Sequence, residues 1–201
     1  MEQVASLSEL ISILVNTLKS IWDNNPTFYP GAIGALIAIL SIKTQRQTSR
    51  EKNSLDFEAA YKRNDQVNEA WAKVLEIYKN RLTTPVEHWG RPDLSQTDEA
   101  KALKTIFNEW ERCANAIHHK IYDEKYLYKV YGSTLIFLDV QFDPYIQECR
   151  KKNPRFYRNM KLLALNWRVR RAYDDADNKD KNYAKLLKDA QKCIDRLNVT
   201  F

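Results

Sequence analysis

The residues of this chain best able to ligate a metal or to act as acid, base or nucleophile are its histidines and cysteines. Cys113, Cys149 and Cys193 are far apart, so no pair has the spacing of a zinc site or of a disulfide framework. His118 and His119 are adjacent, and neighbouring side chains on a helix point about 100° apart, which disfavours a shared metal. We therefore predict no metal site and no cofactor, and the unpaired cysteines fit a reducing compartment.

A second pattern joins an arginine to these histidines. Arg112 precedes His118 and His119 on a segment with helical periodicity. This arrangement resembles the ribonuclease motif of the all-α HEPN nucleases, and the resemblance implies that the arginine and a histidine face a scissile phosphate. The sequence has no glycine-rich phosphate loop, no Gly-x-Ser-x-Gly elbow and no His-Glu-x-x-His. A non-enzymatic protein is the favoured interpretation, and a membrane-tethered ribonuclease is the alternative.

The third pattern is a basic stretch near the C-terminus, between Glu148 and Asp174, that contains no acidic residue. Interleaved aromatic residues make it a candidate for binding RNA, a nucleotide or anionic lipid headgroups. The competing interpretation is a solvated helix face, with the aromatic residues in the core. For a membrane-tethered domain the nearest anion is lipid, so we predict membrane-surface or anion binding and no nucleic acid. The residues assigned to this binding are Arg150, Lys151, Lys152, Arg155 and Arg158 in this stretch, together with Lys43, Arg46 and Arg50 nearer the N-terminus.

An uncharged stretch near the N-terminus indicates how such a domain would be attached to a membrane. Residues 28–42 read FYPGAIGALIAILSI. Fifteen helical residues span about 22 Å, against about 30 Å of hydrocarbon, but Tyr29 suits one interface and Lys43 and Arg46 can snorkel at the other. We predict a transmembrane helix over residues 28–42. A buried helix of a soluble protein, packed on its own core or on a partner, is the alternative.

Small residues and flanking charges refine this prediction. Gly31, Gly34, Ala35 and Ala38 recur with the spacing that lets two helices approach closely in lipid, which predicts a homo-oligomer. Upstream only Lys19 is basic, whereas downstream the chain carries Lys43, Arg46, Arg50, Lys52 and Lys62. The positive-inside rule then places the C-terminal bulk in the cytoplasm, at the inner membrane of the cell.

The rest of the sequence predicts helices, and these helices would position the residues described above. With only 4 glycines and 6 prolines in 201 residues, the composition excludes turn-rich all-β folds. We predict an all-α protein with five or six helices beyond the membrane. Thr97 and Asp123 are expected N-caps, as are Asp143 and Asn153, each of which is followed by proline.

These readings divide the chain into five segments. Residues 1–27 form an amphipathic or second membrane helix, residues 28–42 the transmembrane helix and residues 43–66 a juxtamembrane helix. Residues 67–173 form the helical cytoplasmic domain, and residues 174–201 a C-terminal helix with an apolar stripe at Tyr183, Leu186, Leu187, Ala190, Ile194 and Leu197.

The stretch NEWERCANAIHHKIYDEKYLYKVYG, residues 108–132, resembles the family catalogued as domain of unknown function 4760. The resemblance extends over residues 30–168, from the apolar segment through Pro144-Tyr145-Ile146 to Trp167. It implies a bacterial or phage-encoded protein with an N-terminal hydrophobic segment and a helical cytoplasmic domain. Arg112 stands where an apolar residue is expected, and Lys120 where glycine is usual.

Together these features predict a non-enzymatic membrane-anchored protein that self-associates and senses or scaffolds at the cytoplasmic membrane face. Antiphage defence or superinfection exclusion is a fitting setting. The partners expected are the lipid bilayer, further copies of the chain, and a protein or an anionic ligand. The alternatives are the tethered ribonuclease and a soluble adaptor whose apolar N-terminus packs on a partner protein.

Overall fold

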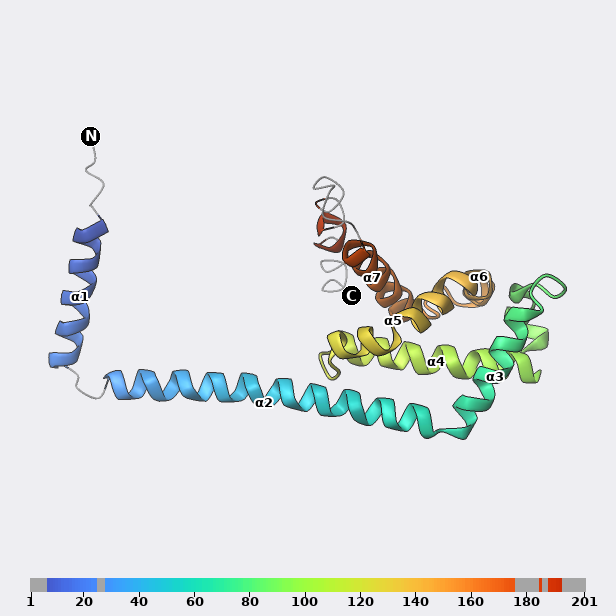
Figure 1. Cartoon of the computed structure of the whole chain (residues 1–201), viewed down its shortest axis with the longest axis horizontal. Coiled ribbons are helices and arrows are strands. Elements are labelled where there is room, and N and C mark those ends of the chain that lie inside the picture. Colours follow the sequence, from blue (N-terminus) through green and yellow to red (C-terminus); the bar gives the residue numbers. More distant parts are fainter. Residues whose placement is uncertain (1–6, 25–27, 176–184, 186–187, 193–201) are drawn as a thin grey trace. The chain divides into compact units, whose positions relative to one another are not determined.

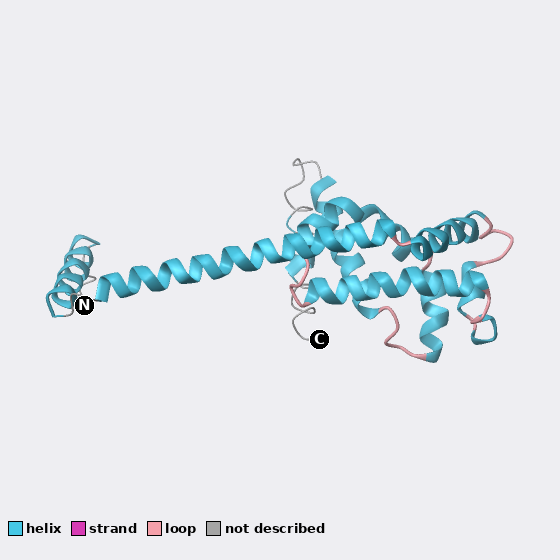
Figure 2. Ribbon diagram, turned by 90° about the horizontal axis from the view of Figure 1, so that it is seen from below, coloured by secondary structure: helices cyan, strands magenta, loops and turns pink. Residues whose placement is uncertain are grey.

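The computed structural model describes residues 7–24, 28–175, 185 and 188–192. Within these ranges the regular structure is helical, with seven α-helices, two 3-10 helices and no strand (Figures 1 and 2). The predicted all-α fold is confirmed. The chain divides into two compact units, residues 1–48 and residues 49–201, which are described separately below. The predicted C-terminal helix lies outside the described residues, except for Lys185 and the helical residues 188–192.

The first unit contains helix α1 (Leu7–Asn24) and the beginning of helix α2 (Phe28–Arg63). The Tyr29 hydroxyl donates a hydrogen bond to the main-chain carbonyl of Leu18, with an O···O distance of 2.6 Å. This bond links the first turn of α2 to α1. Tyr29 thus has a structural partner in addition to the interfacial role that the sequence suggested.

No helix in the described ranges is long and apolar enough to cross a membrane. The transmembrane helix that we expected over residues 28–42 therefore does not meet this requirement. The reason is length, because the uncharged run ends at Lys43 after fifteen residues and α2 continues as a polar helix. Residues 28–42 are the opening of a 36-residue helix that contains no glycine or proline after Gly34.

The second unit is built on helix α4 (Asp98–His118), which carries the centre of the core. Thr97 caps it as predicted, since its hydroxyl accepts a hydrogen bond from the Ala100 N–H at 3.3 Å. Leu103, Phe107, Trp110, Ala114 and Ile117 recur with the helical period, and all five are buried.

Four further helices pack around α4 or one another: α3 (Asp65–Lys79), α5 (Glu124–Gln141), α6 (Asp143–Lys152) and α7 (Arg158–Asp175). Helices α3 and α7 pack on α4, α5 packs on α7, and α6 packs on the short helix η1 (Val86–Gly90), which is followed by η2 (Pro92–Leu94) (Figure 1). The second half of α2 joins the same core through Phe57 and Tyr61, whose rings lie against Trp110. The result is one continuous core.

Aspartate and asparagine mark the helix starts only partly as predicted. The Asp123 carboxylate accepts the Tyr126 N–H at 2.7 Å and caps α5. In contrast, α6 begins at Asp143 itself, and Asn153 ends α6 rather than starting α7. Tyr157, with φ of 55°, lies in the left-handed region and delays the start of α7 to Arg158.

Three residues that continue apolar helical patterns lie outside the core. Leu82 lies beyond the end of α3 and is 91% exposed, because α3 stops at Lys79 and a turn follows. Val130 and Phe156 are likewise exposed rather than buried. In α7, by contrast, Met160, Leu163, Ala164 and Trp167 form a stripe that is buried.

Candidate functional site

The most distinctive surface of the first unit is apolar. Six large aliphatic side chains in the first part of α2 are between 50% and 63% exposed: Ile33, Leu36, Ile37, Ile39, Leu40 and Ile42. Each helical residue advances by about 100°, so these six positions spread over about 220° of the helix circumference. The remaining sector carries the small residues Gly31, Gly34, Ala38 and Ser41, so the helix has no charged face here. A helix that is apolar all round is typical of a buried or lipid-embedded element, not of one in water.

Helix α1 adds a second apolar surface of a different kind. Ile11, Ile13, Leu14 and Val15 are each more than half exposed, but Glu9 interrupts the apolar pattern at the start of the helix. Helix α1 therefore has an amphipathic character. It fits a position in the plane of a membrane interface or against another helix.

The four small residues assigned to helix association lie on the exposed part of α2. Gly31, Gly34, Ala35 and Ala38 are all exposed. A Cβ atom built on Gly31 or Gly34 would meet nothing within 4 Å. These positions are therefore open to the close approach of a second helix.

The basic residues after the apolar stretch remain on the same helix. Lys43 and Arg46 are exposed in the first unit, and Arg50 is half-buried in the second. The Arg50 carbonyl accepts a hydrogen bond from the buried Ser54 hydroxyl at 2.9 Å. The Ser54 oxygen in turn accepts the Asp123 N–H at 2.7 Å, which fixes this part of α2 against the turn before α5.

The C-terminal basic stretch is less available than its composition suggests. The Arg150 Nε donates to the Phe156 carbonyl at 3.0 Å, and Lys151 forms an ion pair with Glu148 at 2.5 Å. Arg158 is half-buried at the start of α7, whereas Lys152 and Arg155 are exposed. Of the five predicted anion-binding residues in this stretch, Lys152 and Arg155 present their charge most openly.

Two further members of the stretch, Lys161 and Arg168, are neutralised by acids from other helices. Lys161 lies 2.7 Å from the buried Asp139 carboxylate and 2.5 Å from Asp143, and Arg168 lies 3.3 Å from Asp139. These acids come from α5 and α6, so no reading of the basic segment alone could find them.

The arginine and histidines of the nuclease interpretation lie at the exposed end of α4. Arg112 forms an ion pair with Glu109, while His118 and His119 are exposed with their rings 5.3 Å apart. Arg112 and His119 are seven residues apart and share a helix face, about 10 Å apart along the axis. His118 points in a different direction from Arg112.

One feature was not indicated by any sequence pattern. A cavity of about 390 Å³ lies between the start of α5, the second half of α7 and residues 188–191. Lys125, Arg170 and Lys188 all line it. These residues are far apart in the sequence, so only the fold reveals that they share a site.

The fold and these surfaces define a class: an all-α protein with an apolar N-terminal helix and a helical domain built around α4. Over residues 28–167 the chain matches the family described as Domain of unknown function (DUF4760), and it belongs to that family. The resemblance found in the sequence is thus confirmed. No curated protein and no solved structure matches the chain.

Proposed function

We propose that this is a non-enzymatic membrane-attached protein that self-associates and senses or scaffolds at the cytoplasmic face of the inner membrane. The apolar part of α2 is the attachment element, and Gly31, Gly34, Ala35 and Ala38 form the contact between copies. Antiphage defence or superinfection exclusion is the setting that we favour.

The observation that carries this proposal is the spread of exposed aliphatic side chains over about 220° of the α2 circumference, with small uncharged residues in the remaining sector. A partner protein that covers one face of this helix would leave the opposite face in water. Complete transfer of one such side chain out of water is worth about 1.5 to 3 kcal/mol, so six half-exposed ones provide on the order of 5 to 10 kcal/mol. Lipid or a bundle of identical helices within lipid can supply that environment.

The charges next to this segment support a defined orientation. Lys43 directly follows the last apolar residue, Arg46 comes less than one helical turn later, and both can reach anionic headgroups. The second unit follows them in the chain and would lie on the same side of the membrane. The positive-inside rule makes that side the cytoplasm.

The test is flotation of the full-length protein with anionic phospholipid vesicles. We expect the wild type to float and the double variant Ile37→Glu, Leu40→Glu to remain in the dense fraction. The matched control is Leu75→Glu, Leu82→Glu, which changes two exposed leucines of the second unit and should float like the wild type. Far-ultraviolet circular dichroism checks that all variants keep their helices.

Two results would overturn the proposal: a wild type that stays in the dense fraction, or a double variant that floats as well as the wild type. The effector role has its own test. Overexpression in a bacterial host is expected to alter the membrane potential or the plating of phage. An unchanged potential together with a strictly monomeric detergent-solubilised protein would contradict it.

A further inference from the structure

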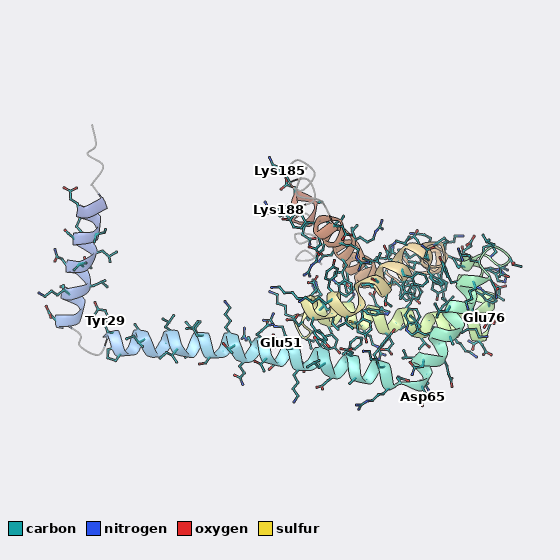
Figure 3. All side chains as sticks on the ribbon, in the orientation of Figure 1. Tyr29, Glu51, Asp65, Glu76, Lys185 and Lys188 are labelled. Carbon is teal, nitrogen blue, oxygen red and sulfur yellow. The ribbon has the colours of Figure 1, made fainter. Side chains whose placement is uncertain are left out.

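The cavity beside α7 has the properties of a site for a small anion. Lys125 comes from the first turn of α5, and Arg170 comes from α7. Lys188 belongs to the helical segment 188–192, next to α7 (Figure 3). Three cations from three separate segments thus line one cavity of about 390 Å³. A volume of this size suits a ligand with one ring and one charged group.

The acid in the lining offsets only part of this charge. Glu124 already accepts hydrogen bonds through its Oε1 atom, from the Asn166 side-chain amide at 3.3 Å and from the Trp167 indole N–H at 3.2 Å. Its role is therefore to hold α5 against α7. One carboxylate against three cations leaves a net positive lining.

Two features show that the site is built rather than accidental. Asn166 is only 7% exposed, and its carbonyl oxygen accepts a hydrogen bond from the Gln191 side-chain amide, which ties the segment 188–192 to α7. The Arg170 guanidinium lies 4.1 Å from the centre of the Tyr128 ring, which orients it before any ligand arrives. Both contacts fix lining residues in place.

The remaining wall suits the uncharged part of a ligand. Val169 and Tyr173 lie one helical turn apart on α7 and both line the cavity. Tyr173 is half-exposed, so its ring is available for stacking.

We propose that this cavity binds a small organic anion, in which a phosphate or carboxylate group meets Lys125, Arg170 and Lys188 and a ring lies on Val169 and Tyr173. This site is separate from the apolar surface of α2 and does not depend on membrane attachment. It would give the protein a soluble ligand to sense.

The test uses pyridoxal 5′-phosphate as an affinity label on the full-length protein in neutral detergent. Its aldehyde condenses with a lysine amine and releases one water, and borohydride reduces the imine to a secondary amine that peptide mass spectrometry locates. Pyridoxal, which has the same ring and aldehyde but no phosphate, is the matched reagent. The comparison is between lysines within one sample, so differences in reagent reactivity cancel.

At limiting reagent we expect Lys125 and Lys188 to take up about tenfold more pyridoxal 5′-phosphate than Lys129 and Lys185. Lys129 is exposed one turn further along α5, and Lys185 is exposed on the C-terminal side of the chain but does not line the cavity. With pyridoxal, and in the Arg170→Gln variant, this preference should fall to about twofold or less.

Competition then identifies the anionic group. Protection of Lys125 and Lys188 by phenyl phosphate but not by benzoate indicates a phosphate ligand, and the reverse indicates a carboxylate. Equal labelling of the four lysines, an undiminished preference with pyridoxal, or no protection by either competitor would overturn the proposal. Loss of vesicle flotation would not affect it.

Discussion

The Glu111 carboxylate on α4 accepts a hydrogen bond from the Met160 N–H at 2.8 Å, and so caps the first turn of α7 from another helix. Its other oxygen accepts from the N–H and the side-chain amide of Asn159, at 3.1 and 2.9 Å. A negative charge at a helix N-terminus also interacts favourably with the helix dipole. One side chain therefore satisfies several donors of α7 and joins two helices.

We expect Glu111→Ala to lower the free energy of unfolding by about 2 kcal/mol, because it leaves helix-terminal donors without a partner. The measurement is denaturant unfolding followed by circular dichroism. Glu109→Ala is the control from the same helix. Its partner Arg112 is 72% exposed, so the loss should stay below about 0.5 kcal/mol. Equal losses in the two variants would contradict the capping role.

Asp139 is the second acid that we expect to matter for stability. Its side chain is 3% exposed and lies beside Lys161 and Arg168. Asp139→Asn removes the charge that compensates a partly buried lysine, and should lower the free energy of unfolding by about 3 kcal/mol. Asp143→Asn, at a 42% exposed partner of the same lysine, should cost less than about 1 kcal/mol. The same unfolding assay compares them, and the reverse order would refute the assignment.

Lys120 occupies a position that favours glycine. Its φ is 56°, its N–H donates to the Ile117 carbonyl, and the Ile121 N–H donates to the Ala116 carbonyl, which is the Schellman pattern at the end of α4. We expect Lys120→Gly to raise the free energy of unfolding by up to about 1 kcal/mol. Lys129→Gly, within α5, should lower it by about 1 kcal/mol. A loss of stability in Lys120→Gly would show that the lysine side chain outweighs its backbone strain.

Gly34 is the position at which we test self-association. Because a Cβ there meets nothing within 4 Å, Gly34→Leu should leave each copy folded and attached to vesicles. It should weaken the oligomer, since a large side chain separates helices that small residues bring close. Sizing in detergent by analytical ultracentrifugation is the measurement. Ala32→Leu, about 100° from Gly31 around the helix, is the control. An unchanged mass for Gly34→Leu would argue against this contact.

Buried thiol and phenol groups make stability depend on alkaline pH. Burial raises the pKa of Cys113 from 9.0 to about 12, and those of Tyr61 and Tyr157 from 10.0 to about 12. Above the ordinary pKa values of 9.0 and 10.0, these groups lose their protons in the unfolded chain but keep them in the folded chain. The free energy of unfolding therefore falls as pH rises. The full stability is therefore present below pH 9 and declines toward pH 12.

Denaturant midpoints measured on both sides of pH 9 check this expectation. Cys113→Ala removes one of the titrating groups and should make the decline shallower, although burial of a smaller side chain lowers the stability at neutral pH. A midpoint that stays constant up to pH 12 would contradict the buried state of these groups.

The parts of the fold that were predictable from the sequence depend on neighbours in the chain. Thr97 and Asp123 cap the helices that they immediately precede, and the stripe from Leu103 to Ile117 follows the period of its own helix. The start of α7 was misplaced because Tyr157 adopts a left-handed conformation, which no local pattern indicated.

The same distinction between local pattern and tertiary packing applies to the candidate sites. The exposed apolar face of α2 is a run of consecutive residues and was visible in the sequence. Asp139 neutralises two members of the basic stretch from a different helix, and the cavity brings together Lys125, Arg170 and Lys188 from distant parts of the sequence. Such sites depend on tertiary packing and become visible only with the fold.

The origin of the helix caps also has a consequence for the order of folding. Helices α4 and α5 carry their caps at Thr97 and Asp123, so their first turns can form as soon as those segments leave the unfolded state. The cap of α7 is 49 residues away in sequence, at Glu111. The first turn of α7 therefore becomes stable only after α4 has docked, which makes it a late event with a low φ-value.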